Sequence, residues 1–183
     1  MKEIYNQFKS ELMDSCIPFW LDNGVDKEYG GLINCLDRFG KVYSKDKSVW
    51  MQGRAGWMFS YIYNNIDKNE KYLEFAKSCI DFATNNCIDN DGRMFFTVTN
   101  DGRPLRKRRY WFSETFYIIA NAEYFMATKD INYLNTAKKY FDFVYGMYVD
   151  PTTDSYKITP KCFDETRNVK SLANPMILMN VAS

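Results

Sequence analysis

The strongest candidate for chemistry is an arginine set among aromatic residues. Four residues have the spacing of a single helix face: Trp50, Arg54, Trp57 and Tyr61. On a pocket wall, the guanidinium would present fixed hydrogen-bond donors to an oxygen-rich ligand, and the rings would stack against a sugar. The same spacing fits an arginine that snorkels or pairs with a carboxylate inside the core, so both interpretations stay open.

Other catalytic groups are restricted by composition. The sequence contains no histidine, so an imidazole of this chain alone cannot act as general base or metal ligand. The cysteines are odd in number and form no Cys-x-x-Cys pair: Cys16, Cys35, Cys79, Cys87 and Cys162. We therefore expect neither a disulfide framework nor a metal site. This cysteine usage and the lack of a signal-peptide pattern predict a cytoplasmic protein.

The segments that must position Arg54 repeat along the chain with a period of 61 residues. A shift of this length superimposes segment 72–82 on segment 133–143. Both copies carry apolar residues at helical spacing with polar residues between them, which predicts amphipathic helices. Segments 50–63 and 113–127 are apolar on nearly every side, which is typical of buried helices.

Alternating amphipathic and buried helices predict two concentric layers with one helix pair per repeat. We therefore predict an all-α fold, an α/α toroid. Extended stretches at 29–36 and 94–98 are followed by turn signals and predict short β-hairpins on one rim. Ser48 and Ser113 are candidate N-caps of the buried helices, and Pro175 has the position of a first-turn proline in a third.

The chain length fits one domain, at 183 residues and 21.6 kDa. Three repeats of about 61 residues fill the sequence, which ends on a helix of the buried type, whereas a closed toroid needs more repeats to cover its edges. We expect a single partial barrel domain over 1–183, truncated relative to a closed toroid. Its exposed edges would favour a homo-oligomer or a missing C-terminal half as partner.

The overall charge offers no field that would attract a polyanion. Lys plus Arg total 24 against 23 for Asp plus Glu, and no apolar run approaches the length of a membrane span. We therefore expect no nucleic-acid partner and no membrane partner. The one dense charge cluster holds five basic residues within 103–109. A solvated loop is the interpretation that we favour, with anion or nucleotide binding as the alternative.

Several short motifs occur in one order along nearly the whole chain. They are Phe19-Trp20, Gly30-Gly31, Asp37-Arg38-Phe39-Gly40, the Lys47-to-Arg54 run KSVWMQGR, Phe112-Ser113-Glu114-Thr115-Phe116-Tyr117, Ala122-Glu123-Tyr124 and Asn174-Pro175-Met176. In this order they resemble the N-acylglucosamine 2-epimerase family, also called renin-binding proteins, whose relatives include cellobiose 2-epimerases and mannose isomerases. The resemblance implies the N-terminal half of an (α/α)6 barrel that interconverts N-acyl-D-glucosamine and N-acyl-D-mannosamine without a cofactor.

The resemblance also implies roles for individual residues. Enzymes of this family abstract the C2 proton of the ring-opened sugar and return a proton to the opposite face, using histidines from the second half of the barrel. Arg54 matches the arginine that steadies the developing oxyanion and is the predicted catalytic residue. Five residues on matching segments are candidates for substrate binding: Trp50, Gln52, Phe112, Glu114 and Asn174. Because it lacks histidine, we expect this chain to supply only the Arg54 side and to be inactive alone.

Other functions stay open at this point. The chain could be a non-catalytic structural or interaction half, or belong to a related aldose–ketose isomerase or cellobiose 2-epimerase. Its ligand would be a small amino sugar or another aldose, and some members of the family respond to ATP. An inverting glycoside hydrolase would need two carboxylates about 6.5–9.5 Å apart. Glu114 and Glu123 lie nine residues apart on one predicted helix and do not share a face, so we do not predict that they form such a pair.

Overall fold

The computed structural model describes residues 1–107, 110–154 and 172–183. Its main helices are α1 (Lys2–Ser10), α2 (Ile17–Asn23), α3 (Val49–Asn65), α4 (Glu70–Asn86), α5 (Phe112–Thr128), α6 (Ile131–Val149) and α7 (Ala173–Ala182). Two short helical segments complete the set, the π-helical η1 (Glu11–Cys16) and the 3-10 helix η2 (Pro151–Thr153). Cys162, Arg108 and Arg109 lie outside the described residues.

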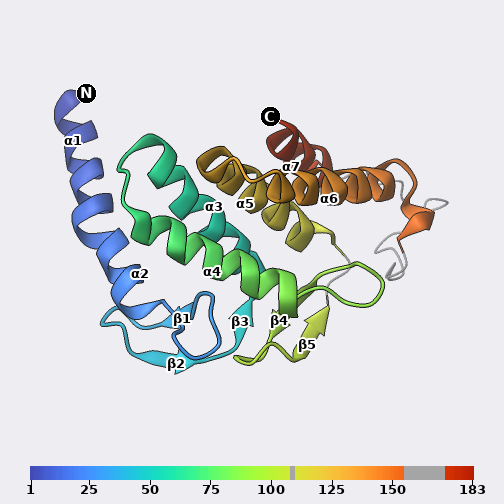
Figure 1. Cartoon of the computed structure of the whole chain (residues 1–183), viewed down its shortest axis with the longest axis horizontal. Helices are drawn as coiled ribbons and strands as arrows, with labels where there is room; N and C mark the ends of the chain where they lie inside the picture. Colours follow the sequence, from blue (N-terminus) through green and yellow to red (C-terminus); the bar gives the residue numbers. More distant parts are fainter. Residues whose placement is uncertain (108–109, 155–171) are drawn as a thin grey trace.

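The helices form two layers, as the alternating patterns predict (Figure 1). In the inner layer α3 packs against α5, and each is followed by an outer helix that packs back onto it, α4 onto α3 and α6 onto α5. Helix α7 packs against α5 and α6. The inner pair approaches closely because α3 carries glycine at the contact: a Cβ on Gly53 would lie 2.7 Å from backbone atoms of Phe116. This close packing fixes α3 and α5 relative to each other.

The outer helices begin where side chains satisfy their first N–H groups. Asn69 accepts a hydrogen bond from the N–H of Lys71 at the start of α4, and Asp130 accepts one from Asn132 at the start of α6. Ser48 occupies the predicted N-cap position of α3 without a capping bond from its side chain. The N-cap predicted at Ser113 is wrong, because α5 begins at Phe112 with Trp111 in the N-cap position, two residues before Ser113.

The first helix projects as an exposed edge of the molecule. Helices α1, η1 and α2 follow one another as an almost continuous rod, and all residues of α1 are exposed (Figure 1). Ile4, Tyr5 and Phe8 are 58%, 63% and 69% exposed, so an apolar strip has no cover among the described residues. Leu12 and Met13 of η1 are the first residues to pack against the core, and Ile17 is the first to be buried in it.

The strands form two small antiparallel sheets on one side of the helices, as predicted (Figure 1). One pairs β1 (Cys35–Leu36) with β2 (Val42–Ser44), and the other has the order β3 (Lys47–Ser48), β4 (Phe95–Val98) and β5 (Pro104–Lys107). Strand β3 is not predicted by the sequence, because no hairpin signal accompanies Lys47–Ser48. It leads directly into α3, so the β4–β5 hairpin is tied to the start of the helix that carries Arg54.

A buried lysine connects the loop between α2 and β1 to the turn between β4 and β5. The Lys47 ammonium lies 2.6 Å from a carboxylate oxygen of Asp26 and donates hydrogen bonds to the carbonyl oxygens of Gly30 and Asn100. It also lies 4.0 Å from the ring centroid of Phe82. Because the Lys47 side chain is fully buried, these contacts replace the water that its charge would otherwise require.

No helix in the described part of the chain is long and apolar enough to cross a membrane.

Candidate functional site

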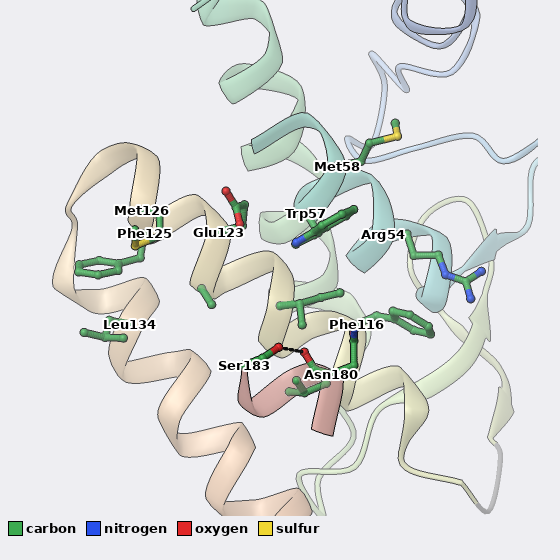
Figure 2. Close-up of a pocket in the computed structure, with 13 residues that line it drawn as sticks. Arg54, Trp57, Met58, Phe116, Glu123, Phe125, Met126, Leu134, Asn180 and Ser183 are labelled. Carbon is green, nitrogen blue, oxygen red and sulfur yellow. Dashed lines mark hydrogen bonds between the residues drawn. The ribbon is translucent and has the colours of Figure 1, made fainter. Parts of the chain in front are cut away.

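A pocket of about 860 Å³ opens on the inner layer, along the faces of α3 and α5 (Figure 2). Its wall is largely apolar, with polar groups at a few points. The residues that line it are Arg54, Trp57, Met58, Phe116, Ile119, Ala122, Glu123, Phe125, Met126, Leu134, Asn180, Val181 and Ser183. A concave apolar wall with few polar groups is the usual form of a small-molecule site.

Arg54 lies at one end of this pocket and is exposed (Figure 2). Its guanidinium carbon lies 4.3 Å from the ring centroid of Phe116 and 5.7 Å from that of Trp50. Its nearest polar contact is the sulfur of Met51, at 4.0 Å. No carboxylate of residues 1–107, 110–154 or 172–183 forms a salt bridge with it. Arg54 is therefore not buried in the core with a carboxylate of the described residues, and its exposed guanidinium over two rings fits both a snorkelling arginine and a pocket arginine.

Trp50 stands at the centre of an aromatic cluster beside Arg54. The cluster consists of Trp50, Phe96, Phe112 and Phe116, and the centroids of the three phenylalanines lie 5.1, 5.9 and 5.5 Å from that of Trp50. The indole N–H of Trp50 donates a hydrogen bond of 3.0 Å to the hydroxyl of Ser113. Of the predicted binding residues, Trp50 thus lies next to Arg54 and Phe112 packs on Trp50, although neither lines the pocket itself.

Gln52 lies in the interior, away from the pocket. Its side chain is fully buried, and it accepts a hydrogen bond from the N–H of Leu32 and donates one to the carbonyl of the same residue, each 2.8 Å long. The Gln52 amide thus pairs with the backbone of Leu32 as a neighbouring β-strand would, and it holds the segment around Gly31 against α3. Both hydrogen-bonding groups of the amide are therefore engaged within the protein.

Glu114 is also fully buried, in the first turn of α5. Its carboxylate accepts hydrogen bonds from Nε of Arg93, at 2.7 Å, and from the N–H of Met94, at 2.8 Å. Arg93 also pairs with Asp154. Burial raises the pKa of the Glu114 carboxyl above its ordinary value, and the Arg93 guanidinium limits that rise. The carboxylate ties α5 to the loop before β4, and it does not reach the pocket.

Asn174 lies in the first turn of α7 and is half-buried. It does not line the pocket, whereas Asn180 of the same helix does. No described residue makes a hydrogen bond to the Asn174 side chain. Of the six predicted site residues, Arg54 alone reaches the pocket wall, Trp50 and Phe112 support it, and the other three lie apart from it.

The pocket also contains residues that were not singled out as site residues. Trp57 lines the wall and stacks on Tyr61 with centroids 5.2 Å apart, as their shared helix face indicates. Glu123 is the one carboxylate side chain among the lining residues, and it accepts a hydrogen bond of 2.6 Å from Asn64. The described wall therefore lacks the pair of carboxylates that an inverting glycoside hydrolase requires. No group of three or more acidic or cysteine residues in the described chain could hold a metal ion.

The fold and the site define a class of protein: part of an α/α toroidal domain whose inner helices carry an aromatic pocket with an exposed arginine that has no carboxylate partner among the described residues. A model of the family N-acylglucosamine 2-epimerase (GlcNAc 2-epimerase) matches residues 31–182. The chain belongs to this family.

The relatives and solved structures agree with that assignment. The chain is 30% identical over 184 residues to the N-acylglucosamine 2-epimerase of Rattus norvegicus, covering 98% of the chain and 43% of the relative. It is 31% identical over 140 residues to the cellobiose 2-epimerase of Ruminococcus albus, covering 75% and 35%. The solved cellobiose 2-epimerase of Spirochaeta thermophila superposes with a TM-score of 0.80 at 25% identity, covering 98% of this chain and 47% of that one.

The chain thus spans less than half the length of these relatives. The predicted fold class is confirmed: the structure matches about half of an (α/α)6 barrel and carries short hairpins on one rim.

Proposed function

We propose that this chain supplies the arginine-bearing half of a sugar 2-epimerase site, and that the complete barrel interconverts N-acyl-D-glucosamine and N-acyl-D-mannosamine. The observation that carries the proposal is Arg54, an exposed guanidinium with no described carboxylate partner, beside an aromatic cluster at the end of an apolar pocket. The choice of substrate rests on the sequence match, which reaches 98% of the chain for an N-acylglucosamine 2-epimerase and 75% for a cellobiose 2-epimerase at similar identity, because the fold match is shared with cellobiose 2-epimerases.

The reaction explains why such an arginine is useful. Removing the C2 proton of the open-chain sugar moves the electron pair of the C–H bond toward C1 and places negative charge on the carbonyl oxygen. A fixed guanidinium stabilises that charge more in the transition state than in the bound substrate. A proton then returns to C2 from the opposite face, which regenerates the carbonyl with inverted configuration. Arg54 is the residue that we assign to the developing oxyanion.

The two proton-transfer steps require acid/base groups on opposite faces of the sugar. The sequence has no histidine, and Glu123 is the one carboxylate side chain on the described pocket wall. We propose that both groups come from the rest of the barrel and that residues 1–183 form a partial domain. No cofactor is needed for this chemistry, and we place the protein in the cytoplasm.

The other predicted residues take different roles in this proposal. Trp50 lies against the Arg54 guanidinium and Phe112 packs on Trp50, so in this proposal the two rings act as positioning residues for Arg54. Gln52 and Glu114 act as positioning residues, because their hydrogen bonds hold a hairpin and the start of α5 in place. Asn174 remains a candidate for a substrate contact from α7.

A second candidate function is a structural half without catalysis. The observation that favours it is the exposed apolar strip on α1 formed by Ile4, Tyr5 and Phe8. On α7 at the other edge, Met176 and Met179 are 56% and 74% exposed. A separate polypeptide that supplies the remaining helices, or a second copy of this chain, would cover both edges.

Binding and exchange measurements test the proposal together. N-acetyl-D-mannosamine is titrated into the chain by calorimetry, with Arg54→Gln as the test variant. Arg38→Gln is the control, because Arg38 is also exposed and also lies over a ring, that of Phe39. Arg54→Gln is expected to weaken binding about tenfold, with no change for the control. Equal affinities of the two variants would rule out the role of Arg54.

Incubation in deuterated water then tests the division of the site. The chain alone is expected to show no exchange of the C2 proton of N-acetyl-D-mannosamine. Exchange should appear when the C-terminal half of the rat N-acylglucosamine 2-epimerase is added as a separate polypeptide. Turnover by the chain alone would show that its own residues supply both proton-transfer groups, against the half-site proposal. Binding without exchange in the mixture would favour the non-catalytic function.

A further inference from the structure

The pocket that contains Arg54 carries one other charged side chain among the described residues, the carboxylate of Glu123. Glu123 lies on α5 seven residues after Phe116, the ring that the Arg54 guanidinium covers at 4.3 Å. A helix rises about 1.5 Å per residue, which puts these two positions about 10 Å apart along α5. No salt bridge joins Arg54 and Glu123. The pocket wall therefore holds a cation and an anion at two separate places, with Trp57 between them in the view of Figure 2.

An amide of the neighbouring inner helix holds the Glu123 carboxylate in place. Nδ2 of Asn64, near the end of α3, lies 2.6 Å from Oε1 of Glu123 and 3.1 Å from the backbone carbonyl oxygen of the same residue, and it donates a hydrogen bond to each. No described lysine or arginine forms a salt bridge with Glu123. The second carboxylate oxygen, Oε2, accepts no hydrogen bond from the described residues. The carboxylate is therefore fixed on the wall and is still available to a donor in the pocket.

The wall between the two charged groups is apolar. Helix α5 contributes Ile119 and Ala122 between Phe116 and Glu123, and α3 contributes the half-buried ring of Trp57. A guanidinium only donates hydrogen bonds, and an ionised carboxylate only accepts them. The pocket thus presents donors at one end, an apolar stretch in the middle and an acceptor further along.

An open-chain aldose has the complementary order of groups. Its carbonyl oxygen accepts hydrogen bonds, and the hydroxyl groups at the far end of its carbon chain donate them. We infer that Glu123 is a specificity-determining residue, which accepts a hydrogen bond from the terminal hydroxyl of the sugar while the carbonyl oxygen faces Arg54. A neutral sugar then serves both charged side chains of the wall. This inference rests on the proposed function and adds to it the direction in which the substrate lies along α5.

Calorimetry with two ligands tests the inference. They are N-acetyl-D-mannosaminitol, the reduced sugar that cannot close into a ring, and its 6-deoxy analogue, which lacks the terminal hydroxyl. A site built to bond a hydroxyl group rejects an analogue without it, so the unsubstituted chain should bind the 6-deoxy compound about tenfold more weakly. This comparison does not depend on the folding of any variant.

Two variants then locate the preference. Glu123→Gln should reduce it to less than twofold, because the neutral amide is a weaker acceptor than the carboxylate. The control Glu74→Gln removes the same charge from an exposed position on α4 outside this pocket and should keep the tenfold preference. Circular dichroism checks that both variants are folded. A Glu123 that only supported the helix contact would change the affinity for both ligands by the same factor and leave the preference as it was.

The remaining outcomes count against the inference. Equal binding of the two ligands by the unsubstituted chain would overturn it, and so would a preference that persists in Glu123→Gln. The proposed function is tested separately by Arg54→Gln, which should weaken both ligands alike and retain the preference for the terminal hydroxyl. Weaker binding in Arg54→Gln without any such preference would remove the role of Glu123 and keep the epimerase half-site. No binding of either ligand would count against both proposals.

Discussion

Substituting Gly53 by alanine tests whether the close approach of the two inner helices holds the site together. The new Cβ would lie 2.7 Å from the carbonyl carbon, the carbonyl oxygen and the Cβ of Phe116. Ordinary van der Waals contacts begin near 3.4 Å, so α3 and α5 must separate by several tenths of an ångström. Backbone atoms cannot turn aside as a side chain could. The methyl group therefore strains the whole contact between α3 and α5.

The expected magnitude follows from two opposing effects. Alanine favours a helix over glycine by about 0.8–1.0 kcal/mol, and overpacking of a dense contact costs about 1–3 kcal/mol. Since the clash involves backbone, we expect the upper part of that range and a net loss of about 1–2 kcal/mol in the free energy of unfolding. The strain also moves Phe116 relative to Arg54, so sugar binding should weaken together with stability.

The matched control is Gly146→Ala on outer helix α6. No atom lies within 4 Å of the Cβ that this substitution would add. Only the higher helix propensity of alanine then acts, so the free energy of unfolding of this variant should rise by about 0.5–1 kcal/mol. Urea unfolding followed by circular dichroism measures both. The free energy of unfolding should fall for Gly53→Ala and rise for Gly146→Ala. A Gly53→Ala protein of equal or higher stability would refute the argument that glycine is required for the packing of α3 on α5.

Two further predictions concern buried polar groups. Gln52→Leu leaves the N–H and the carbonyl of Leu32 without their partners, so it should lower the free energy of unfolding in urea by about 2–5 kcal/mol. The control Gln7→Leu on exposed α1 should leave that free energy nearly unchanged. Similar losses in the two variants would contradict the role of the Gln52 amide. Burial acts to raise the pKa of Asp26, but Lys47 and two backbone N–H groups outweigh it and hold that pKa below its ordinary value of 3.8. The stability that this carboxylate contributes is therefore present above about pH 4 and is lost as the pH falls through the lowered pKa of the folded state. The free energy of unfolding of Asp26→Asn should therefore fall less between pH 5 and pH 2 than that of the unsubstituted protein. Parallel curves for the two proteins would argue against a stabilising Asp26–Lys47 pair.

The helical layers were predictable because their signal is local. Leu73, Ala76, Ile80 and Ala83 recur at helical spacing, and all four are buried in α4. A helix can be inferred from such a run because its hydrogen bonds and its buried face both lie within a few turns of sequence. The same reasoning located the face of α3 that carries Arg54.

The polar contacts were not predictable because their partners are distant in sequence. Glu114 has the residue type of a site acid, yet it pairs with Arg93, 21 residues earlier. Gln52 stands two residues from Arg54 in the most specific motif, yet helix geometry turns it inward to meet Leu32, 20 residues away. A motif identifies a segment as important, and which of its side chains face a ligand depends on the tertiary packing around it.

The contacts of the Lys47 ammonium restrict which loops of this fold can be exchanged separately in evolution or design. It joins the acceptors Gly30 and Asn100, which belong to different hairpin loops 70 residues apart, to the carboxylate of Asp26. Both loop acceptors are backbone carbonyl oxygens, so a graft that changes the conformation of one loop would leave the buried charge with an acceptor missing. The two loops therefore form one exchangeable unit, to be inherited, transplanted or redesigned together with the lysine between them.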